Sequence, residues 1–331
     1  MKRNFPIIAF LSCFFIFGCS STKLGYFCKS IVNPIPVHDM VLDDSCRHLY
    51  YSMTIGDEEK VDTILFFITG TGNASLQYYL KSYFQGLTGN IHIFALQPRH
   101  VTNRETGIFQ PSEAYNQENT FRIRVEDNIK FILQTLANNG TSYKRIVVFG
   151  VSAGGTVASV AASVVPDVTH LVVLGEGGMK ELDAFRLWGR KYGIDFDQEY
   201  KKIKADPDST KKKFLGEHTY KWWASYLEVN PMDYLHSLEI PMLFCAGKKD
   251  EMVPVESLYY LRDRFEELGK TNLTVKLYPD CNHVLIDSKG ISHRIYFMKF
   301  VSSWLRNTTI GHQSPPPPRN EPLEPDQQAG G

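Results

Sequence analysis

Residues 145–165 read RIVVFGVSAGGTVASVAASVV and combine three kinds of local pattern. The apolar run Arg145–Phe149 predicts a buried strand, and the small residues of Thr156–Val165 predict a helix that packs closely on it. Between them, residues 150–154 match the pattern G-x-S-x-G. A sharp strand-to-helix turn needs glycines beside the serine, because Cβ atoms would clash there. We expect this turn to expose the Ser152 hydroxyl at the positive end of the helix dipole. The alternative is a glycine-rich helix start that Ser152 caps.

Further apolar runs alternate with helical patterns on both sides of this segment, which is typical of a mostly parallel sheet covered by helices. The runs are Arg47–Ile55, Val61–Ile68, Ile91–Leu96, Thr169–Leu174, Pro241–Ala246 and Leu273–Tyr278. The first two flank the polar residues 56–60, and we expect them to pair antiparallel.

Three segments show the apolar spacing of helices. In residues 117–138 the apolar positions recur every three or four residues and predict one buried stripe. The stripe consists of Phe121, Val125, Ile129, Ile132, Leu133 and Leu136. Val255–Leu268 and Ser292–Leu305 also read as helices. Residues 176–234 lack a strand pattern and contain three of the four tryptophans, so we expect a small helical cap there.

A serine hydroxyl needs a base to accept its proton, and the base needs a carboxylate to orient it. Asp250 follows the run Pro241–Ala246, and His283 follows the run Leu273–Tyr278. Both side chains therefore fall at the carboxyl ends of strands, as Ser152 does. Asp250 has an alternative role as a cap of the helix near Val255. Glu176, just after the strand ending at Leu174, is a rival for the role of the acid.

The order serine, aspartate, histidine resembles the α/β-hydrolase family, with which residues 60–306 agree. The G-x-x-D-x-x-V-P form around Asp250 is similar to its dienelactone hydrolase and prolyl oligopeptidase-like branches. The resemblance implies an α/β-hydrolase fold with Ser152 as nucleophile, His283 as general base and then acid, and Asp250 as the residue that orients the imidazole.

An acyl-transfer site also needs two donors for the oxyanion. The first would be the backbone N–H of Ala153, directly after the nucleophile. The resemblance places the second donor after the strand Ile64–Ile68. We expect the backbone N–H of Thr71 in this role, and that of Gly72 as the next candidate. The Gly-x-Gly pattern at this point lacks the third glycine and the acidic residue of a dinucleotide site, so the sequence predicts no cofactor.

The loop at residues 97–115 carries Arg99, His100 and Arg104 and follows a strand. These residues offer a binding site for an acidic substrate group. An ordinary surface loop is the reading that we favour, because connecting segments run over the surface and are usually polar.

The N-terminus has the layout of an export signal. Two positive charges precede the apolar run Phe5–Phe17, which is too short to span a bilayer because a spanning helix needs about 20 residues. Ile16–Cys19 resembles the lipobox of bacterial lipoproteins, which implies removal of residues 1–18 and lipidation of Cys19. We expect attachment to the bacterial cell envelope through this membrane anchor. An ordinary signal peptide that merely contains a cysteine is the alternative.

Export permits disulfide bonds, and Cys28 with Cys46 is the pair that we favour among the cysteines of the exported chain. Neither C-x-x-C nor H-E-x-x-H occurs, so the sequence suggests no metal site. We expect a lipidated tether and lead-in segment at residues 19–45, a hydrolase domain at 46–311, and a disordered proline-rich tail at 312–331.

The charges of the chain narrow the choice of function. The sequence has 331 residues, with 36 basic and 36 acidic side chains. This balance disfavours a nucleic-acid binder, which normally carries a basic excess. We therefore expect a lipid-anchored serine hydrolase whose substrate is a small-molecule or lipid-like ester. A peptidase or thioesterase would use the same residues, and a non-catalytic binding protein on the same scaffold is the alternative from another class.

Overall fold

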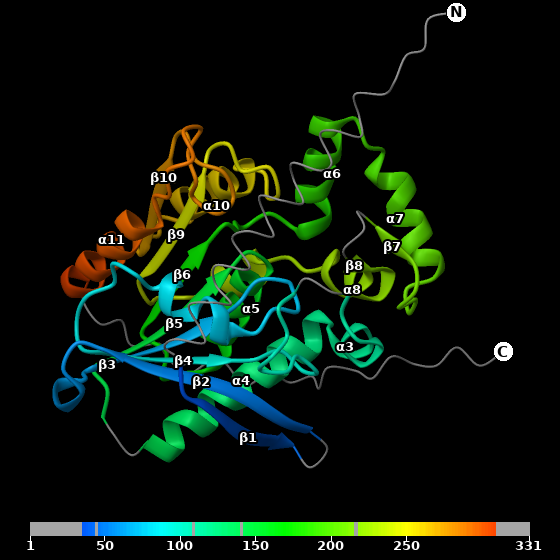
Figure 1. Ribbon diagram of the computed structural model, residues 1–331. Coiled ribbons are helices and arrows are strands. Elements are labelled where there is room, and N and C mark those ends of the chain that lie inside the picture. The colour runs from blue at the N-terminus through cyan, green and yellow to red at the C-terminus, as the bar shows by residue number, and fades with distance from the viewer. Residues whose placement is uncertain (1–34, 44–45, 108–109, 140–141, 215–217, 309–331) are drawn as a thin grey trace, which may run out of the picture.

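An eight-stranded sheet runs through the centre of the protein, shown in Figure 1 as a computed structural model. The structure describes residues 35–43, 46–107, 110–139, 142–214 and 218–308. The strands of this sheet are β1 (Val37–Asp43), β2 (Cys46–Ile55), β3 (Thr63–Ile68), β4 (Ile91–Leu96), β5 (Arg145–Val151), β6 (His170–Leu174), β9 (Met242–Gly247) and β10 (Leu273–Tyr278). Their order is β1-β2-β4-β3-β5-β6-β9-β10, and only the pairs β1–β2 and β2–β4 are antiparallel.

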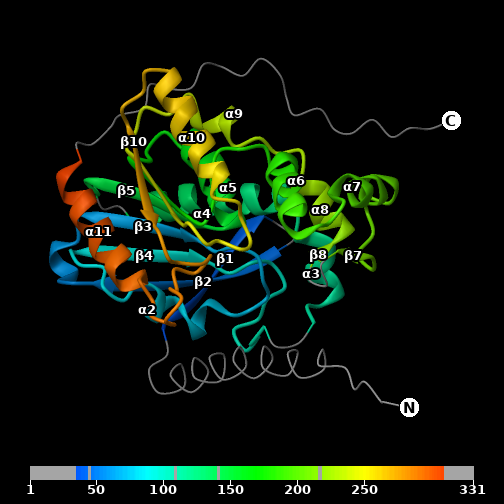
Figure 2. The same cartoon turned by 90° about the horizontal axis from the view of Figure 1, so that it is seen from above.

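Helices cover both faces of the sheet, as Figure 2 shows. The helices outside the segment between β6 and β9 are η1 (Glu58–Lys60), η2 (Leu76–Tyr78), α2 (Leu80–Tyr83), α3 (Glu113–Glu118), α4 (Phe121–Asn139), α5 (Ala153–Val164), α10 (Glu256–Glu267) and α11 (Arg294–Asn307). Side chains of α4, α5 and α10 share one apolar core with the sheet, and those of α2 and α11 share the other.

Strand β3 shows how one strand supplies both cores. All six of its residues are buried, and they alternate between the two sides. Ile64 and Phe66 join the core under α4 and α5, whereas Leu65 and Phe67 join the core under α2 and α11. A continuous apolar run is typical of a parallel strand that is buried on both faces. The mostly parallel, doubly covered sheet confirms the predicted α/β-hydrolase fold class.

The predicted antiparallel pairing of Arg47–Ile55 with Val61–Ile68 is wrong. Strand β4 lies between the two, antiparallel to β2 and parallel to β3. The physical reason is burial, because β3 is apolar on both faces and gains most in the interior of the sheet, between β4 and β5. The polar connection does not hold β3 against β2.

Two other expectations need correction. Val37–Asp43, within the segment expected to be a lead-in, is a strand that pairs with β2 along the edge of the sheet. Half-buried and exposed residues alternate along it, a pattern too weak to stand out in the sequence. Leu133 in α4 was expected in the core but is 46% exposed, because it lies beyond the side of the helix that faces the sheet.

The segment between β6 and β9 is mostly helical, as predicted for the cap, and also contains a small antiparallel pair of strands that the sequence did not suggest. Its elements are α6 (Glu181–Tyr192), α7 (Phe196–Ala205), β7 (Lys213–Phe214), β8 (His218–Thr219), α8 (Tyr220–Tyr226) and α9 (Met232–Leu235). Figures 1 and 2 show α6, α7 and α8 grouped on one side of the molecule. None of the helices in the described ranges is long and apolar enough to cross a membrane.

Candidate active site

Ser152 lies between β5 and α5 in a sharply turned backbone. Its φ and ψ angles are 51° and −136°, and its side chain makes no capping hydrogen bond to α5. The turn depends on glycine, because a Cβ atom on Gly150 would lie 2.3 Å from the carbonyl oxygen of Gly154. Such strain in a non-glycine residue is typical of functional sites. This half-buried serine therefore does not cap α5 through its side chain, as the alternative interpretation required.

Asp250 and His283 are joined by a hydrogen bond. Asp250 is 3% exposed and follows the end of β9, and its Oδ2 lies 2.8 Å from Nδ1 of His283. Its other oxygen, Oδ1, accepts from the backbone N–H groups of Met252 and Val253 at 2.8 and 2.9 Å. Donation from Nδ1 to the carboxylate leaves Nε2 as the proton-accepting nitrogen of a neutral imidazole. Asp250 does not cap α10, whose N-cap residue is Val255.

The end of β6 contacts both Ser152 and His283. The N–H of Ser152 donates to the carbonyl oxygen of Leu174 at 2.8 Å. The next residue, Gly175, lies against the imidazole, because a Cβ atom placed on it would be 2.9 Å from Cε1 of His283. Two residues far apart in the sequence therefore meet at the same strand end.

Glu176, the rival acid, lies in a different position. It is 5% exposed, and its Oε1 accepts from the N–H of Gly177 at 2.9 Å. Burial and the nearby carboxylate of Glu181 raise its pKa well above the usual value. Since the hydrogen bond of His283 runs to Asp250, the geometry favours Asp250 as the partner of the imidazole.

Two of the three predicted oxyanion donors, Ala153 and Thr71, lie beside the same serine, and no contact among the described residues places Gly72 there. Thr71, Ser152 and Ala153 line one cavity. Gly70 backs directly onto the serine, because a Cβ atom on it would be 3.2 Å from Cβ of Ser152. Gly72 has a φ angle of 131°, and its carbonyl oxygen accepts from the hydroxyl of Tyr115 at 3.0 Å.

The cavity beside Ser152 has a volume of about 270 Å³. Aromatic side chains from the segment between β6 and β9 form much of its wall, and three of the tryptophans are among them. The aromatic residues that line it are Phe185, Trp188, His218, Trp222, Trp223 and Tyr226. Burial lowers the pKa of His218 to about 4, which makes this ring neutral at pH 7.

Two buried glutamates stand out in this apolar cavity. Glu176 lines it together with Glu181, which is also 5% exposed. Oε1 of Glu181 accepts from the hydroxyl of Thr156 at 2.8 Å, and burial raises the pKa of the carboxyl to about 7. No local sequence pattern marks Glu181, because only the fold brings the start of α6 beside the start of α5.

Two side chains of the loop at residues 97–115 bind carboxylates of the helices α3 and α4. Arg99 donates to both oxygens of Asp127 at 2.7 Å and to Glu118 at 3.1 Å. Nε2 of His100 lies 3.0 Å from the same Glu118 carboxylate, and Arg104 is exposed. These contacts support the reading as a surface loop over that as a substrate-binding site.

Several predictions fall outside the described residues. They are the signal peptide at residues 1–18, lipidated Cys19, the tail at 312–331, and the Cys28–Cys46 disulfide, since Cys28 and the Cys46 side chain are not described. Cys245 and Cys281 are buried and free.

Comparison with solved structures gives the same fold in proteins of low sequence identity. Est1E of Butyrivibrio proteoclasticus matches with a TM-score of 0.56 and 13% identity, over 82% of this chain and 97% of that one. The Pyrococcus furiosus esterase Pf2001 has a TM-score of 0.56 and 17% identity, over 82% and 91% of the two chains. The acylaminoacyl peptidase of Pyrococcus horikoshii has a TM-score of 0.56 and 12% identity, over 87% of this chain but 44% of its own.

Sequence comparisons point to one family. The uncharacterized peptidase YuxL of Bacillus subtilis is 28% identical over 90 residues, which cover 27% of this chain and 13% of YuxL. The chain thus spans a small part of that relative and less than half of the acylaminoacyl peptidase. The model of the prolyl oligopeptidase family matches residues 113–310, more than half of the chain. With its fold and this match, the chain belongs to the prolyl oligopeptidase family of serine hydrolases.

Proposed function

We propose that the protein hydrolyses carboxylic esters through an acyl-enzyme on Ser152. The observation that carries this proposal is the 2.8 Å hydrogen bond between His283 and Asp250 at the strand end that also holds the turned backbone of Ser152. A nucleophile, a base and a carboxylate that orients the base are the parts that acyl transfer needs.

In the acylation step, Nε2 of His283 accepts the proton of the Ser152 hydroxyl as Oγ attacks the carbonyl carbon of the ester. The negative charge moves to the carbonyl oxygen, which accepts hydrogen bonds from the N–H groups of Ala153 and Thr71. Asp250 stabilises the imidazolium that forms, because its carboxylate is already bound to Nδ1. The imidazolium then gives its proton to the leaving alcohol as the ester bond breaks.

In the deacylation step, water replaces the alcohol. His283 accepts a proton from the water as its oxygen attacks the acyl carbon, and a second oxyanion forms between the same donors. Collapse of this intermediate returns the proton to Oγ of Ser152 and releases the carboxylic acid. The enzyme is thereby regenerated without a cofactor.

The lining of the cavity supports an ester substrate. The aromatic walls suit an acyl chain, since burial of each CH₂ contributes about 0.8 kcal/mol. Two of the solved structures with the same fold are esterases, which agrees with this proposal.

Peptide hydrolysis is the second candidate, and the family match supports it. A thioester would react through the same atoms, and a surface-binding protein on the hydrolase scaffold would leave Ser152 unreactive. A panel of p-nitrophenyl esters, acyl thioesters and aminoacyl p-nitroanilides separates these functions. We expect the highest kcat/KM for the esters and loss of all turnover in Ser152→Ala. Higher kcat/KM for the anilides would contradict the ester assignment.

We also propose that Cys19 anchors the protein to the bacterial cell envelope. The apolar run Phe5–Phe17 and the lipobox-like residues Ile16–Cys19 support this proposal. Several acyl chains would give durable attachment, because one chain alone binds membranes only marginally. Metabolic labelling with an alkyne fatty acid should mark the wild type and not Cys19→Ala. An unlabelled wild type would exclude the anchor.

A further inference from the structure

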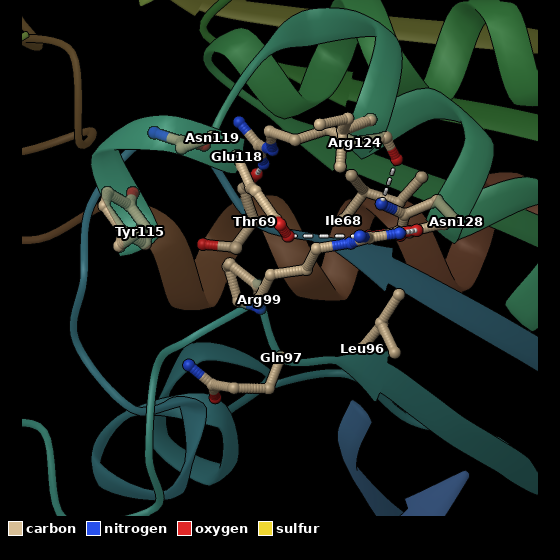
Figure 3. Close-up of a pocket in the computed structure, with 13 residues that line it drawn as sticks. Ile68, Thr69, Leu96, Gln97, Arg99, Tyr115, Glu118, Asn119, Arg124 and Asn128 are labelled. Atoms are coloured by element: carbon tan, nitrogen blue, oxygen red, sulfur yellow. Dashed lines mark hydrogen bonds and ion pairs between the residues drawn. The ribbon is translucent and has the colours of Figure 1, made fainter. Parts of the chain in front are cut away.

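The carbonyl groups of the loop at residues 69–72 are held by side chains from α3 and α4. Nη2 of Arg124 in α4 donates to the carbonyl oxygen of Thr69 and, at 3.2 Å, to that of Gly70. The hydroxyl of Tyr115 in α3 donates to the carbonyl oxygen of Gly72 at 3.0 Å. Figure 3 shows Arg124, Thr69 and Tyr115 around a small polar cavity. Three of the four carbonyl groups in the loop thus have a side-chain donor.

Arg124 is an unusual residue for a helix interior. It is 7% exposed, and its Nη1 donates to the hydroxyl of Tyr226 at 3.2 Å. Within the described ranges it has no carboxylate partner, although a buried charge is costly unless it is paired or fully hydrogen-bonded. Hydrogen bonds to backbone carbonyls and to the phenol of Tyr226 therefore offset the cost of burying this charge. The guanidinium keeps these partners only while the loop keeps its shape.

The geometry of the peptide bond links these carbonyls to the nucleophile. A trans peptide carries its C=O and N–H on opposite sides, and no cis peptide occurs in the described chain. Since Arg124 holds the carbonyls of Thr69 and Gly70, the N–H groups of Gly70 and Thr71 point away from the guanidinium. Thr71 lines the cavity of Ser152, and Gly70 backs onto Ser152 itself.

We propose that Arg124, assisted by Tyr115, is the positioning residue of the oxyanion loop. It fixes the Gly70–Thr71 peptide with its N–H toward the reacting carbonyl. Its donation to the peptide oxygen also polarises that peptide and strengthens the N–H of Thr71 as a donor. This inference rests on the proposed acyl transfer at Ser152 and adds a residue from α4 to it.

The matched control is Arg99, the second guanidinium beside the small polar cavity in Figure 3. Its side chain is 14% exposed, and its hydrogen bonds run to the carboxylates of Asp127 and Glu118. Arg99→Met and Arg124→Met each remove one largely buried guanidinium. Only Arg124→Met removes donors to the loop carbonyls.

The test compares these variants in kcat, KM and affinity for an alkyl trifluoromethyl ketone, whose adduct with serine carries an oxyanion. For Arg124→Met we expect kcat for a p-nitrophenyl ester to fall about 100- to 1000-fold, the range for loss of an oxyanion donor. KM should stay within about threefold, and the inhibition constant of the ketone should rise by the same factor as kcat falls. Arg124→Lys should recover part of both losses, and Arg99→Met should change neither by more than about threefold.

Tyr115→Phe keeps the inference testable if Arg124→Met does not fold, because it removes a single hydroxyl. We expect a loss of about three- to tenfold in kcat and ketone affinity together. Unchanged kcat and ketone affinity in folded Arg124→Met would overturn the inference, as would the same result in Tyr115→Phe if Arg124→Met does not fold. A wild type that hydrolyses none of the substrates would instead contradict the proposed function, and this inference with it.

Discussion

Gly175 at the end of β6 lies directly against the imidazole of His283. A Cβ atom on Gly175 would be 2.9 Å from Cε1 and 3.2 Å from Nδ1 of that ring, both closer than normal contact. The φ angle of Gly175 is +72°, which residues other than glycine adopt at a cost. This glycine therefore sets the place that the histidine can occupy.

Gly175→Ala should displace His283 and impair catalysis. Gly193→Ala is the matched control, because its φ angle is +70° and a Cβ atom there meets no described atom within 4 Å. We expect both variants to lose about 1–2 kcal/mol of stability from backbone strain. Only Gly175→Ala should lose about 100-fold or more in kcat, the effect of a misplacement of about 1 Å. Equal activity of the two variants would mean that the contact with His283 does not position the ring.

Asp250→Asn should lower kcat by about 10³- to 10⁴-fold, because the amide stabilises neither the required tautomer nor the imidazolium. Glu176→Gln should stay within about tenfold of the wild type, since the hydrogen bond of His283 runs to Asp250. Steady-state kinetics on p-nitrophenyl butyrate measures both. A loss in Glu176→Gln as large as that in Asp250→Asn would move the role of the acid to Glu176.

Glu181 should make the stability of the protein depend on pH. Burial raises the pKa of this carboxyl to about 7 in the folded state, above its usual 4.5, so the folded state binds the proton more tightly. The free energy of unfolding should therefore fall as pH rises from about 4.5 to 7, by up to about 3 kcal/mol from this group.

Glu181→Gln removes this titration and keeps an acceptor for Thr156. Thermal unfolding should show the variant more stable relative to the wild type at pH 8 than at pH 5. Glu126→Gln, which changes a partly exposed carboxyl on α4, controls for the loss of an acidic side chain. The same difference between Glu181→Gln and wild type at both pH values would contradict a raised pKa.

The cavity should set the length of the acyl chain. Ala184 on α6 is 3% exposed and lines the cavity of about 270 Å³, so a phenyl ring at this position would fill part of it. In Ala184→Phe we expect kcat/KM for p-nitrophenyl hexanoate to fall about 10- to 100-fold relative to the acetate, because each CH₂ that loses burial costs about 0.8 kcal/mol. An unchanged ratio would place the acyl chain elsewhere.

The residues that sequence analysis could identify are those with a strong local pattern. Ser152, Asp250 and His283 each follow a strand, and the carboxyl ends of parallel strands meet at one edge of a sheet. The structure brings Asp250 and His283 into contact and sets Ser152 at the strand end that carries Gly175. The mostly parallel sheet was predictable because apolar runs alternate with helical patterns along the sequence.

Residues that depend on how distant elements meet could not be found in this way. Arg124 sits within an apolar helical stripe and reads as a neighbour of core residues, until α4 is seen to pack beside the loop at residues 69–72. Glu181 likewise reaches Thr156 only because the start of α6 lies beside the start of α5. The order of β2, β4 and β3 is decided by burial in the completed sheet, which proximity in sequence does not report.

Labelling with a fluorophosphonate probe shows directly whether Ser152 is an activated nucleophile. The wild type should be labelled at Ser152, as peptide mass spectrometry of the adduct would show, and Ser152→Ala should remain unlabelled. His283→Ala should react far more slowly, because the base is missing. A folded wild type that stays unlabelled, or an adduct on another residue, would show that Ser152 is not the nucleophile.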